Sequence, residues 1–226
     1  MHYMIQMSAR PGLAATLKAW CLDILGRQIL DRRRQIERLI VNVATEAPQD
    51  QPYGGGESQQ GEQYDVVLQI WVSGNFNLTE ALHPWNTELA RLVVRQDSYR
   101  LSETVVLERA DLLAGVPSPG LKLLRGLYFF DDMSDFTAKR CWSHHAHLAT
   151  KVHVGMARYV RHWVEEILTP NSPHIRGLSE LHFPSDEAMR ERYFDSPRGR
   201  EEILHDIGHF ISGGTHRIYA KEYILK

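Results

Sequence analysis

Histidines are concentrated in the second half of this 226-residue chain, where ten of the twelve lie between His144 and His216. Histidine is the side chain best suited to proton transfer near neutral pH, and it is also the commonest metal ligand. We therefore expect whatever chemistry the chain performs to be located in its second half.

One histidine of the run His144–His147 belongs to an apolar helical stripe. The spacing of one helix face connects Cys141, His145, Leu148, Val152, Met156 and Tyr159. His145 is predicted to face the sheet, His147 lies on the polar side, and His144 is intermediate. His145 is then either a core histidine bonded to a backbone carbonyl or a buried acid–base group, and the pattern leaves both open.

A second pair, His205 and His209, is separated by four residues on a predicted helix. This spacing can hold a metal ion on one helix face. The sequence offers no third ligand at a recognisable spacing, and Asp206 projects about 100° away from His205 around the helix. We expect no metal and no other cofactor.

Glu180 and His182 lie two residues apart on a predicted strand and therefore share one of its faces. If that face looks at the helix that carries His145, the three groups could converge. Alternatively, Leu181 and Phe183 face inward and His182 faces water. Periodicity alone does not decide between these two arrangements.

The elements that must position these residues follow one order twice. In the first half, apolar patterns predict strands and helices in the order β-α-β-β-α-β. They cover His2–Ala9, Leu13–Leu30, Gln35–Ala44, Tyr64–Ser73, Thr79 to about Gln96, and Tyr99–Arg109. A polar loop, Pro48–Gln63, interrupts the series.

The second half repeats the pattern with one strand fewer between its helices. The predicted elements are the strand Leu121–Phe130, a long helix from Ser134 or Asp135 to about Leu168, the strand Ile175–Phe183, a helical region from Ser185 or Asp186, and the strand His216–Leu225. A linker, Ala114–Gly120, separates modules at 1–113 and 121–226. The predicted fold class is α+β: two ferredoxin-like modules in tandem that form a pseudo-dimeric α+β barrel.

Net charge and hydrophobicity narrow the classes of binding partner that we expect. The formal net charge is −2, from 26 Lys and Arg against 28 Asp and Glu, and the densest basic run, Arg32–Arg34, is typical of a solvated connection. We therefore expect no nucleic-acid partner. No apolar run approaches the roughly 18 residues that a membrane helix needs, so we expect no membrane partner. The expected partner is a small-molecule substrate.

The cysteines and the N-terminal residues indicate the compartment. Cys21 and Cys141 lie far apart and form no disulfide framework, so we interpret them as free thiols in a reducing environment. The start, Met1–Arg10, lacks the features of a signal peptide. We expect cytoplasmic localisation. A chain that completes its barrel internally is predicted to be a monomer or a homodimer.

Four stretches of the second half share motifs with a known family. They are Arg125–Phe130 followed by Ser134–Phe136, Trp142 with His145–Leu148, Ala157–His162, and Gly177–Leu181 with Ser196–Pro197, Asp206 and Phe210. Together they resemble the EthD domain of the dimeric α+β barrel superfamily over residues 121–226. Ala146 and His147 replace a small residue and a proline of the family motif. The spacing from Trp142 leaves either His144 or His145 as the counterpart of the family histidine.

The resemblance implies a pocket between the sheet and the helices, closed by aromatic and aliphatic side chains. Relatives include cofactor-independent isomerases, cyclases, dehydratases and oxygenases that act on lactones, aromatics or polyketide-like compounds, and some distant relatives bind haem. We expect a cofactor-independent lyase or isomerase acting on a small apolar carbonyl, lactone or aromatic substrate. The alternatives are a ligand-binding or stress-related protein without turnover, and a haem- or metal-dependent oxygenase.

His145 is the expected general base or acid of this enzyme. A histidine with a pKa of about 6.5 can carry out this chemistry at cellular pH. The remaining candidates for catalysis are His144, His182, Asp206 and His209. The candidates for substrate binding are Trp142, Tyr128, Tyr159, Glu180 and Phe210.

Overall fold

The structure is a computed structural model that describes residues 1–32, 35–48, 59–60, 63–109 and 113–226. Most of the predicted loop Pro48–Gln63 and part of the arginine run Arg32–Arg34 lie outside the described residues. In the described part of the chain, no helix is both long enough and apolar enough to cross a membrane.

The first module is a four-stranded antiparallel sheet with its helices on one face. Its strands are β1 (His2–Ala9), β2 (Ile36–Ala44), β4 (Val66–Val72) and β5 (Val93–Glu108), in the spatial order β2-β4-β1-β5. Its helical segments are α1 (Ala14–Trp20), the π-helical turn η1 (Cys21–Leu25), α2 (Gly26–Arg32), α3 (Leu78–Leu82), the 3-10 turn η2 (His83–Trp85) and α4 (Asn86–Leu92).

The second module repeats this arrangement. Its elements are β6 (Leu121–Phe129), α5 (Asp135–Val152), β7 (Arg158–Ile167), β8 (Gly177–Phe183), α6 (Asp186–Glu191), α7 (Pro197–Ile207), β9 (Ile211–Thr215) and β10 (Ile218–Ile224). The spatial order β7-β8-β6-β10 corresponds strand for strand to the order β2-β4-β1-β5 of the first module. The short strand β3 (Gln59–Gln60) pairs in parallel with β9.

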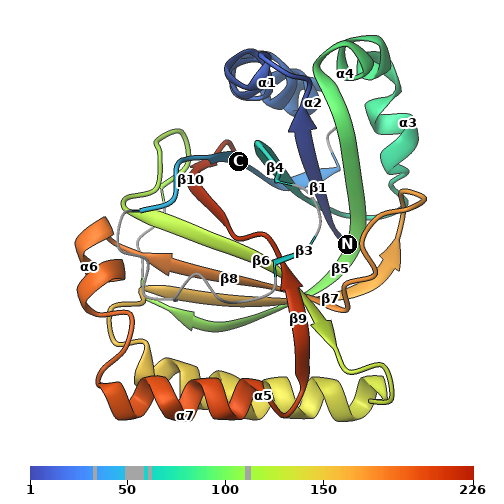
Figure 1. Ribbon diagram of the computed structural model, residues 1–226. Helices are drawn as coiled ribbons and strands as arrows, with labels where there is room; N and C mark the ends of the chain where they lie inside the picture. The colour runs from blue at the N-terminus through green and yellow to red at the C-terminus, as the bar shows by residue number, and fades with distance from the viewer. Residues whose placement is uncertain (33–34, 49–58, 61–62, 110–112) are drawn as a thin grey trace.

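The two sheets join into a closed barrel. Antiparallel pairing connects β5 to β7 and β2 to β10, while β10 also pairs with β6, so eight strands form one continuous ring. In Figure 1, α1 to α4 lie at one end of the molecule and α5 to α7 cover the sheet of the second module. Each sheet therefore has one face toward helices and one toward the barrel interior. The predicted fold, tandem ferredoxin-like modules in a pseudo-dimeric α+β barrel, is confirmed.

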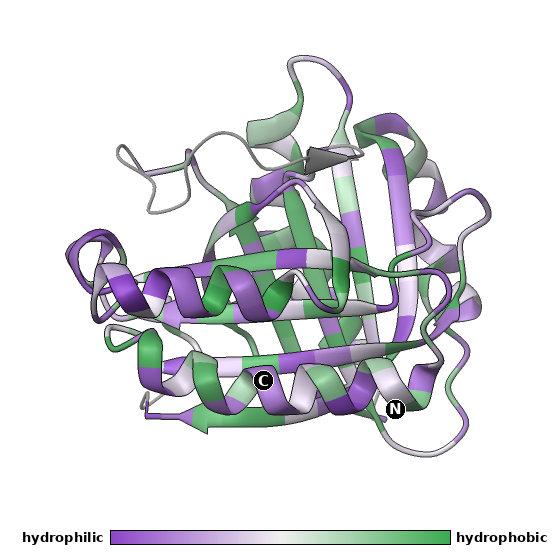
Figure 2. Ribbon diagram, turned by 60° about the horizontal axis from the view of Figure 1, so that its bottom comes forward, coloured by the Kyte–Doolittle hydropathy of each residue, from purple (hydrophilic) through white to green (hydrophobic). Residues whose placement is uncertain are grey.

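Each module has its own apolar layer between helices and sheet. In the first module this layer includes Leu17, Leu25 and Leu68, all almost fully buried, and in the second it includes Ala149, Phe183 and Ile203. Figure 2 shows α5 and α7 at the front with hydrophobic and hydrophilic residues alternating along them. Their amphipathic pattern fits helices that pack on a sheet by one face and meet water with the other.

The predicted long helix of the second module is wrong in its length. Helix α5 ends at Val152, and residues 158–167 form the strand β7, which the sequence analysis had placed inside the helix. Gly155 lies in the turn, where a β-carbon would come within 2.5 Å of the Ala188 carbonyl oxygen. Both faces of β7 are largely buried, so its apolar residues do not alternate with polar ones. In the sequence they therefore look like a continuation of the apolar helical stripe as far as Tyr159. The second module therefore has two strands between its helices, as the first has.

Two boundaries in the first module also differ from the prediction. The first residue of α3 is Leu78, capped by the side chain of Asn77, which accepts a hydrogen bond from the backbone N–H of Glu80. The predicted helix began at Thr79. The helical region ends at Leu92 rather than near Gln96, because β5 begins at Val93 and runs along both β1 and β7. Tertiary strand pairing, which local propensity does not reveal, sets this end.

Candidate active site

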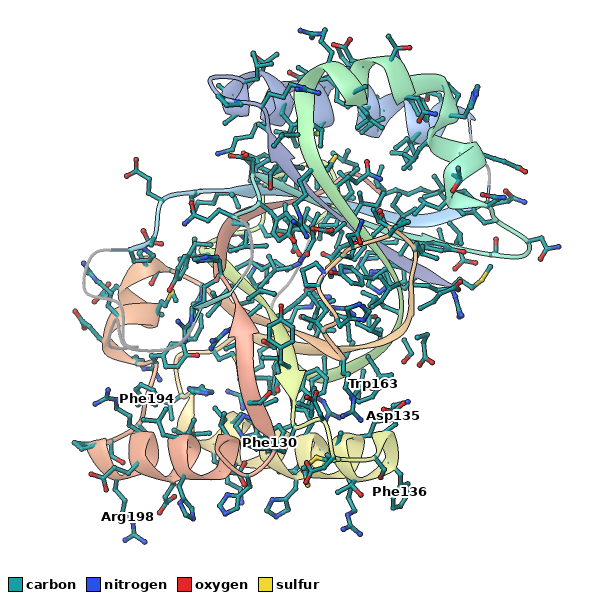
Figure 3. The ribbon with its side chains drawn as sticks, turned by 45° about the vertical axis from the view of Figure 1, so that its right-hand side comes forward. Phe130, Asp135, Phe136, Trp163, Phe194 and Arg198 are labelled. Atoms are coloured by element: carbon teal, nitrogen blue, oxygen red, sulfur yellow. The ribbon has the colours of Figure 1, made fainter. Side chains whose placement is uncertain are left out.

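A cavity of about 320 Å³ lies between the sheet of the second module and the helices α5 and α7. Figure 3 shows these two helices side by side beneath the sheet, with Phe136 near the start of α5 and Arg198 near the start of α7 at the opposite end. The sheet contributes alternate residues to the cavity wall, and α7 contributes apolar ones. They include Leu123, Arg125, Leu127, Ser179 and Leu181 from the strands, and Ile203, Leu204 and Ile207 from the helix.

Helix α5 places His145 in the cavity wall. Ser134 caps the helix by accepting a hydrogen bond from the backbone N–H of Thr137. From there the buried positions Trp142, His145 and Ala149 recur at spacings of three and four, which puts them on the face that packs on the sheet. Helical periodicity thus fixes the direction of His145, as the sequence analysis expected.

His145 is held by a carboxylate from the neighbouring helix. Its Nδ1 lies 2.7 Å from Oδ2 of Asp206, near the end of α7, and the ring of Phe210 packs against the imidazole at a centroid distance of 5.4 Å. The histidine is 7 % exposed, while Asp206 is partly exposed. The carboxylate fixes the ring from outside the cavity, and Phe210 restricts its rotation.

The surroundings of His145 favour the neutral imidazole. Burial lowers the pKa of His145 below its ordinary value, and the hydrogen bond and charge of Asp206 only partly offset this effect. In the neutral ring, Nδ1 donates its proton to the Asp206 carboxylate, so Nε2 carries the lone pair. The site therefore presents a histidine that is ready to accept a proton at neutral pH.

An aromatic wall lies beside the histidine. The indole N–H of Trp142 donates to the hydroxyl of Tyr159 at 3.1 Å, and both side chains are almost fully buried. Burial raises the pKa of Tyr159 to about 12, so the phenol stays protonated. Gly177 of β8 makes room for the indole, because a β-carbon there would lie 2.5 Å from the ring of Trp142. This wall is rigid, apolar and suited to a flat ligand.

The cavity also contains residues that the sequence analysis did not select. Arg125 of β6 and Arg217, which lies between β9 and β10, place positive charge in its wall. His153, just after α5, lines the cavity and donates from Nδ1 to the backbone carbonyl of Tyr193 at 2.6 Å. Arg125 lies two residues from both Leu123 and Leu127 in the same strand. This alternation could have indicated that the three side chains share one face of the strand. His153 carried no comparable signal, because the turn that positions it depends on tertiary packing.

The burial of His153 leads us to predict that the protein loses stability in acid. Burial is the main cause that lowers the pKa of His153 to about 3, whereas an unfolded histidine has a pKa of about 6.5. Between these values only the unfolded state takes up the proton, so the free energy of unfolding falls as the pH decreases from about 6.5 toward 3, by up to roughly 1.4 kcal/mol per pH unit. We expect His153→Gln to flatten this dependence by about one proton in urea unfolding measured from pH 7 to 4.

The matched control for this prediction is His209→Gln. His209 is exposed, and in the part of the chain that the structure describes it contacts His205 through one hydrogen bond to the backbone carbonyl and through its ring. We expect this variant to keep the pH dependence of the wild type. An equal slope for His153→Gln and the wild type would contradict the assignment of the acid dependence to His153.

Three candidates for the site lie on the other side of the sheet. Tyr128 packs in the barrel interior, and Glu180 and His182 point into the same interior, while Leu181 between them lines the cavity. The proposed convergence of Glu180 and His182 with His145 is therefore wrong, because successive side chains of a strand point to opposite faces. The alternative arrangement is correct for Leu181 and Phe183, which face the helices, but wrong for His182, which is 5 % exposed and does not face water.

Two further candidates are exposed on helical segments. His144 points away from the sheet, although it is next to His145, and His209 lies just beyond the end of α7. Of the ten candidates, the structure brings five together at the cavity: Trp142, His145, Tyr159, Asp206 and Phe210.

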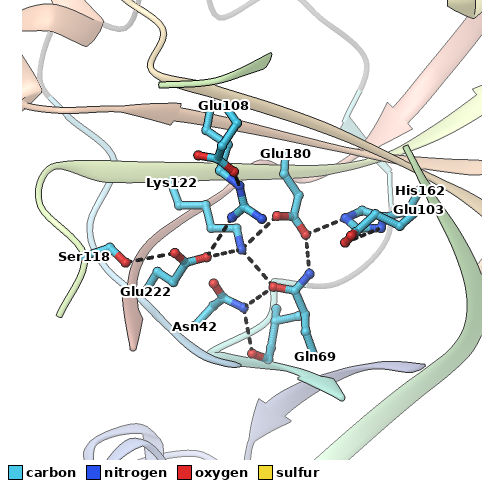
Figure 4. A network of polar contacts seen from close by, with 11 residues as sticks. Asn42, Gln69, Glu103, Glu108, Ser118, Lys122, His162, Glu180 and Glu222 are labelled. Atoms are coloured by element: carbon cyan, nitrogen blue, oxygen red, sulfur yellow. Dashed lines mark hydrogen bonds and ion pairs between the residues drawn. The ribbon is translucent and has the colours of Figure 1, made fainter. Parts of the chain in front are cut away.

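The barrel interior holds a second group of polar residues, shown in Figure 4. Lys122, only 1 % exposed, lies 2.8 Å from Oε2 of Glu180 and 2.7 Å from Oε2 of Glu222, and it donates to Gln69. Burial alone would raise the pKa of Glu222, but Lys122, with other nearby cations, outweighs it and lowers this pKa to about 2. Against the opposing effect of burial, Lys122 likewise holds the pKa of Glu180 well below its ordinary value. Both carboxylates are therefore ionised, and the group is a buried ion network.

The overall structure is similar to several solved structures. An anthrone oxidase-like protein superposes with a TM-score of 0.64 at 10 % identity, covering 99 % of this chain and 92 % of its own. A proposed monooxygenase of Fusobacterium nucleatum gives 0.59 at 7 % identity, covering 100 % and 92 %. A dye-decolorizing peroxidase of Bacteroides thetaiotaomicron gives 0.54 at 9 % identity, covering 98 % and 93 %.

This chain has the dimeric α+β barrel fold. It completes the barrel with two modules of one polypeptide, and the similarity extends over nearly the whole length of each structure. No protein-family model and no curated protein sequence matches the chain. At these identities the similarity establishes the fold and not a reaction, because proteins of one fold carry many unrelated functions.

Proposed function

We propose that the chain is an enzyme in which His145 acts as a general base on a small, mostly apolar carbonyl or phenolic substrate. The observation that carries this proposal is the 2.7 Å contact between Nδ1 of His145 and Asp206 at the wall of an apolar cavity. A histidine oriented by a carboxylate, with its second ring nitrogen available to a bound molecule, is the arrangement that general-base catalysis requires.

The proton transfer can be written with its charges balanced. Nε2 of His145 accepts the proton from a C–H next to a carbonyl, or from a phenol O–H, and leaves an enolate or phenolate. The resulting imidazolium is stabilised by the carboxylate of Asp206. Arg125 and Arg217 supply positive charge near the developing anion. Returning the proton at another carbon gives isomerisation, and expelling a leaving group gives elimination.

The substrate class follows from the cavity. A volume of about 320 Å³ is at the lower end of the range of roughly 300–1,000 Å³ for small-molecule sites. Trp142 and Tyr159 favour a flat ring. The resemblance of residues 121–226 to EthD domains, and a structural neighbour described as anthrone oxidase-like, point toward aromatic ketones that carry a C–H next to the carbonyl.

The proposed reaction involves no haem. Apolar side chains, among them Leu181, Ile203 and Phe210, line the cavity. The chain's own residues, rather than a prosthetic group, are the basis of the proposed chemistry. Incubation with haemin is therefore expected to give no stoichiometric Soret band, and such a band would contradict this point.

The test measures the first step directly. A panel of aromatic ketones and lactones that carry a C–H next to the carbonyl is incubated in D2O with the protein, and the loss of this C–H signal is followed by NMR. The wild type is expected to accelerate exchange, and His145→Ala to slow it by about 100-fold or more, the usual contribution of a general base. The matched control is His144→Ala, which removes the adjacent exposed histidine and should exchange at the wild-type rate.

Two outcomes would contradict the proposal. Equal exchange rates for His145→Ala and the wild type would exclude His145 as the base. Tight binding of a ketone without any exchange would favour the alternative function, a ligand-binding protein that uses the same cavity without turnover.

A further inference from the structure

The barrel interior contains a group of potential metal ligands that is separate from the cavity of His145. His2 of β1, Glu103 of β5 and His162 of β7 each offer one ligand atom, and these atoms lie within 4.8 Å of one another. The three residues come from three adjacent strands and from both modules. They are the only such group of three or more His, Cys, Asp or Glu residues in the part of the chain that the structure describes.

Strand register brings the three residues together. Glu103 pairs directly with His162 across β5 and β7, and His2 pairs with Leu101, two residues before Glu103 on the same face of β5. Direct cross-strand neighbours have β-carbons about 5 Å apart, and diagonal ones about 7–8 Å. The side chains therefore meet because of the barrel closure between β5 and β7, which joins the two modules.

The ligand atoms of this group are buried and lack hydrogen bonds. Among the described residues, no partner is found for either ring nitrogen of His2, for Nδ1 of His162, or for Oε2 of Glu103. His2 is 3 % exposed and His162 is 0 % exposed. Leaving several buried polar atoms unsatisfied is costly, and a bound cation would satisfy them together.

The tautomer of His162 is set for metal binding. Its Nε2 lies 2.7 Å from Oε1 of Glu180, a carboxylate that can only accept, so Nε2 carries the proton and Nδ1 the lone pair. Nδ1 lies 4.0 Å from Oε2 of Glu103. A carboxylate behind the histidine, as shown for Glu180 in Figure 4, is the usual support of a metal-ligating imidazole.

The ring of His2 is also held in place. It stacks on Trp71 of β4 with a centroid distance of 4.0 Å and an interplanar angle of 5°, and it meets His162 edge-on at 4.9 Å. Stacking fixes the plane of the imidazole and leaves its nitrogens at the ring edge, where a cation can bind.

We propose that His2, Glu103 and His162 bind a divalent transition-metal ion of the Zn²⁺ or Fe²⁺ class inside the barrel. Two imidazoles and one carboxylate suit these ions. With bonds of about 2.1 Å, ligand atoms around a tetrahedral ion lie roughly 3.4 Å apart. Starting from separations within 4.8 Å, the ligand atoms therefore approach one another by up to about 1.4 Å on binding. The side chain of Glu103 is 21 % exposed, which gives it room to move and gives the ion a route from solvent.

The experiment uses untagged protein and counts metal directly. Protein stripped with a chelator is titrated with Zn²⁺, and separately with Fe²⁺ under anaerobic conditions, by calorimetry with elemental analysis after dialysis. One ion per chain is expected with at least one of the two metals. His2→Phe, which keeps the stack on Trp71, and Glu103→Gln are each expected to weaken binding by at least about 10–100-fold.

Control variants separate this site from others. The double variant His205→Ala/His209→Ala removes the exposed histidine pair, whose rings lie 4.6 Å apart, and His145→Ala removes the histidine of the cavity. Both controls should bind metal as tightly as the wild type. Unchanged binding in His2→Phe and Glu103→Gln, loss of binding in either control, or no stoichiometric binding at all would overturn the proposal.

Melting temperature gives a readout that does not depend on a ligand titration. The metal is expected to raise the melting temperature of the wild type but not that of His2→Phe. The metal-free His2→Phe variant should melt above the metal-free wild type, because phenylalanine removes two unsatisfied nitrogens from the interior. If His2→Phe fails to fold, Glu103→Gln, on a partly exposed side chain, still decides the outcome.

Discussion

Replacing Lys122 with methionine is expected to lower the free energy of unfolding by about 3–5 kcal/mol. The ammonium group is 2.8 Å from Glu180 and 2.7 Å from Glu222, and all three side chains are almost fully buried. Methionine fills a similar volume but leaves both carboxylates without their shared cation. The loss is measured as the shift in the midpoint of urea unfolding at constant slope.

Two further variants test whether the loss of stability comes from the unpaired charges. Lys151→Met removes an exposed lysine of α5 and should change the free energy of unfolding by less than about 0.5 kcal/mol. Combining Lys122→Met with Glu222→Gln removes one charge of each sign and should cost less than Lys122→Met alone. A double variant that is less stable than the single one would show that the charges are not the reason for the loss.

Asp206→Asn is expected to reduce proton exchange from the substrate by about 100-fold, if His145 is the general base. The amide keeps the shape of the side chain but cannot stabilise the imidazolium that forms during the reaction. The control Glu202→Gln breaks an exposed ion pair with Arg198 on the same helix and should leave the exchange rate unchanged.

The pH profile distinguishes this role from a purely structural one. Activity of a general base falls as the pH decreases through its pKa, because only the unprotonated ring accepts a proton. Burial lowers the pKa of His145 and Asp206 opposes that effect, so Asp206→Asn removes the opposing contribution. The acid limb of the profile should move to lower pH in the variant. An unshifted limb would mean that Asp206 does not act on the protonation of His145.

The position of His145 could be predicted from the sequence because it depends on local geometry. A helix repeats every 3.6 residues, so the apolar neighbours of His145 on one face already placed it toward the sheet. Asp206 was among the candidates, but its contact with His145 joins residues 61 positions apart. Only the packing of α7 against α5 creates that contact.

The strand β7 shows where local reasoning fails. Its residues Tyr159, Val160 and Trp163 are buried on both faces of the sheet, and a strand without alternation resembles one side of a helix in sequence. The same ambiguity hid the partner of Glu103, since His162 was placed on a helix. The direct pairing of Glu103 with His162 arises from the barrel that joins the two modules.

The sequence by itself determined the order of elements in the first module, the tandem arrangement of two modules and the helix face of His145, because each depends on periodicity over short distances. The tertiary structure decided which face of each strand lines the cavity and which face lies in the barrel interior. Lys122, Glu180 and His182 alternate with apolar residues, a pattern that usually indicates a face toward water. Closure of the barrel turns that face inward, where the charges must pair with one another, and leaves the opposite face with His145 to form the cavity.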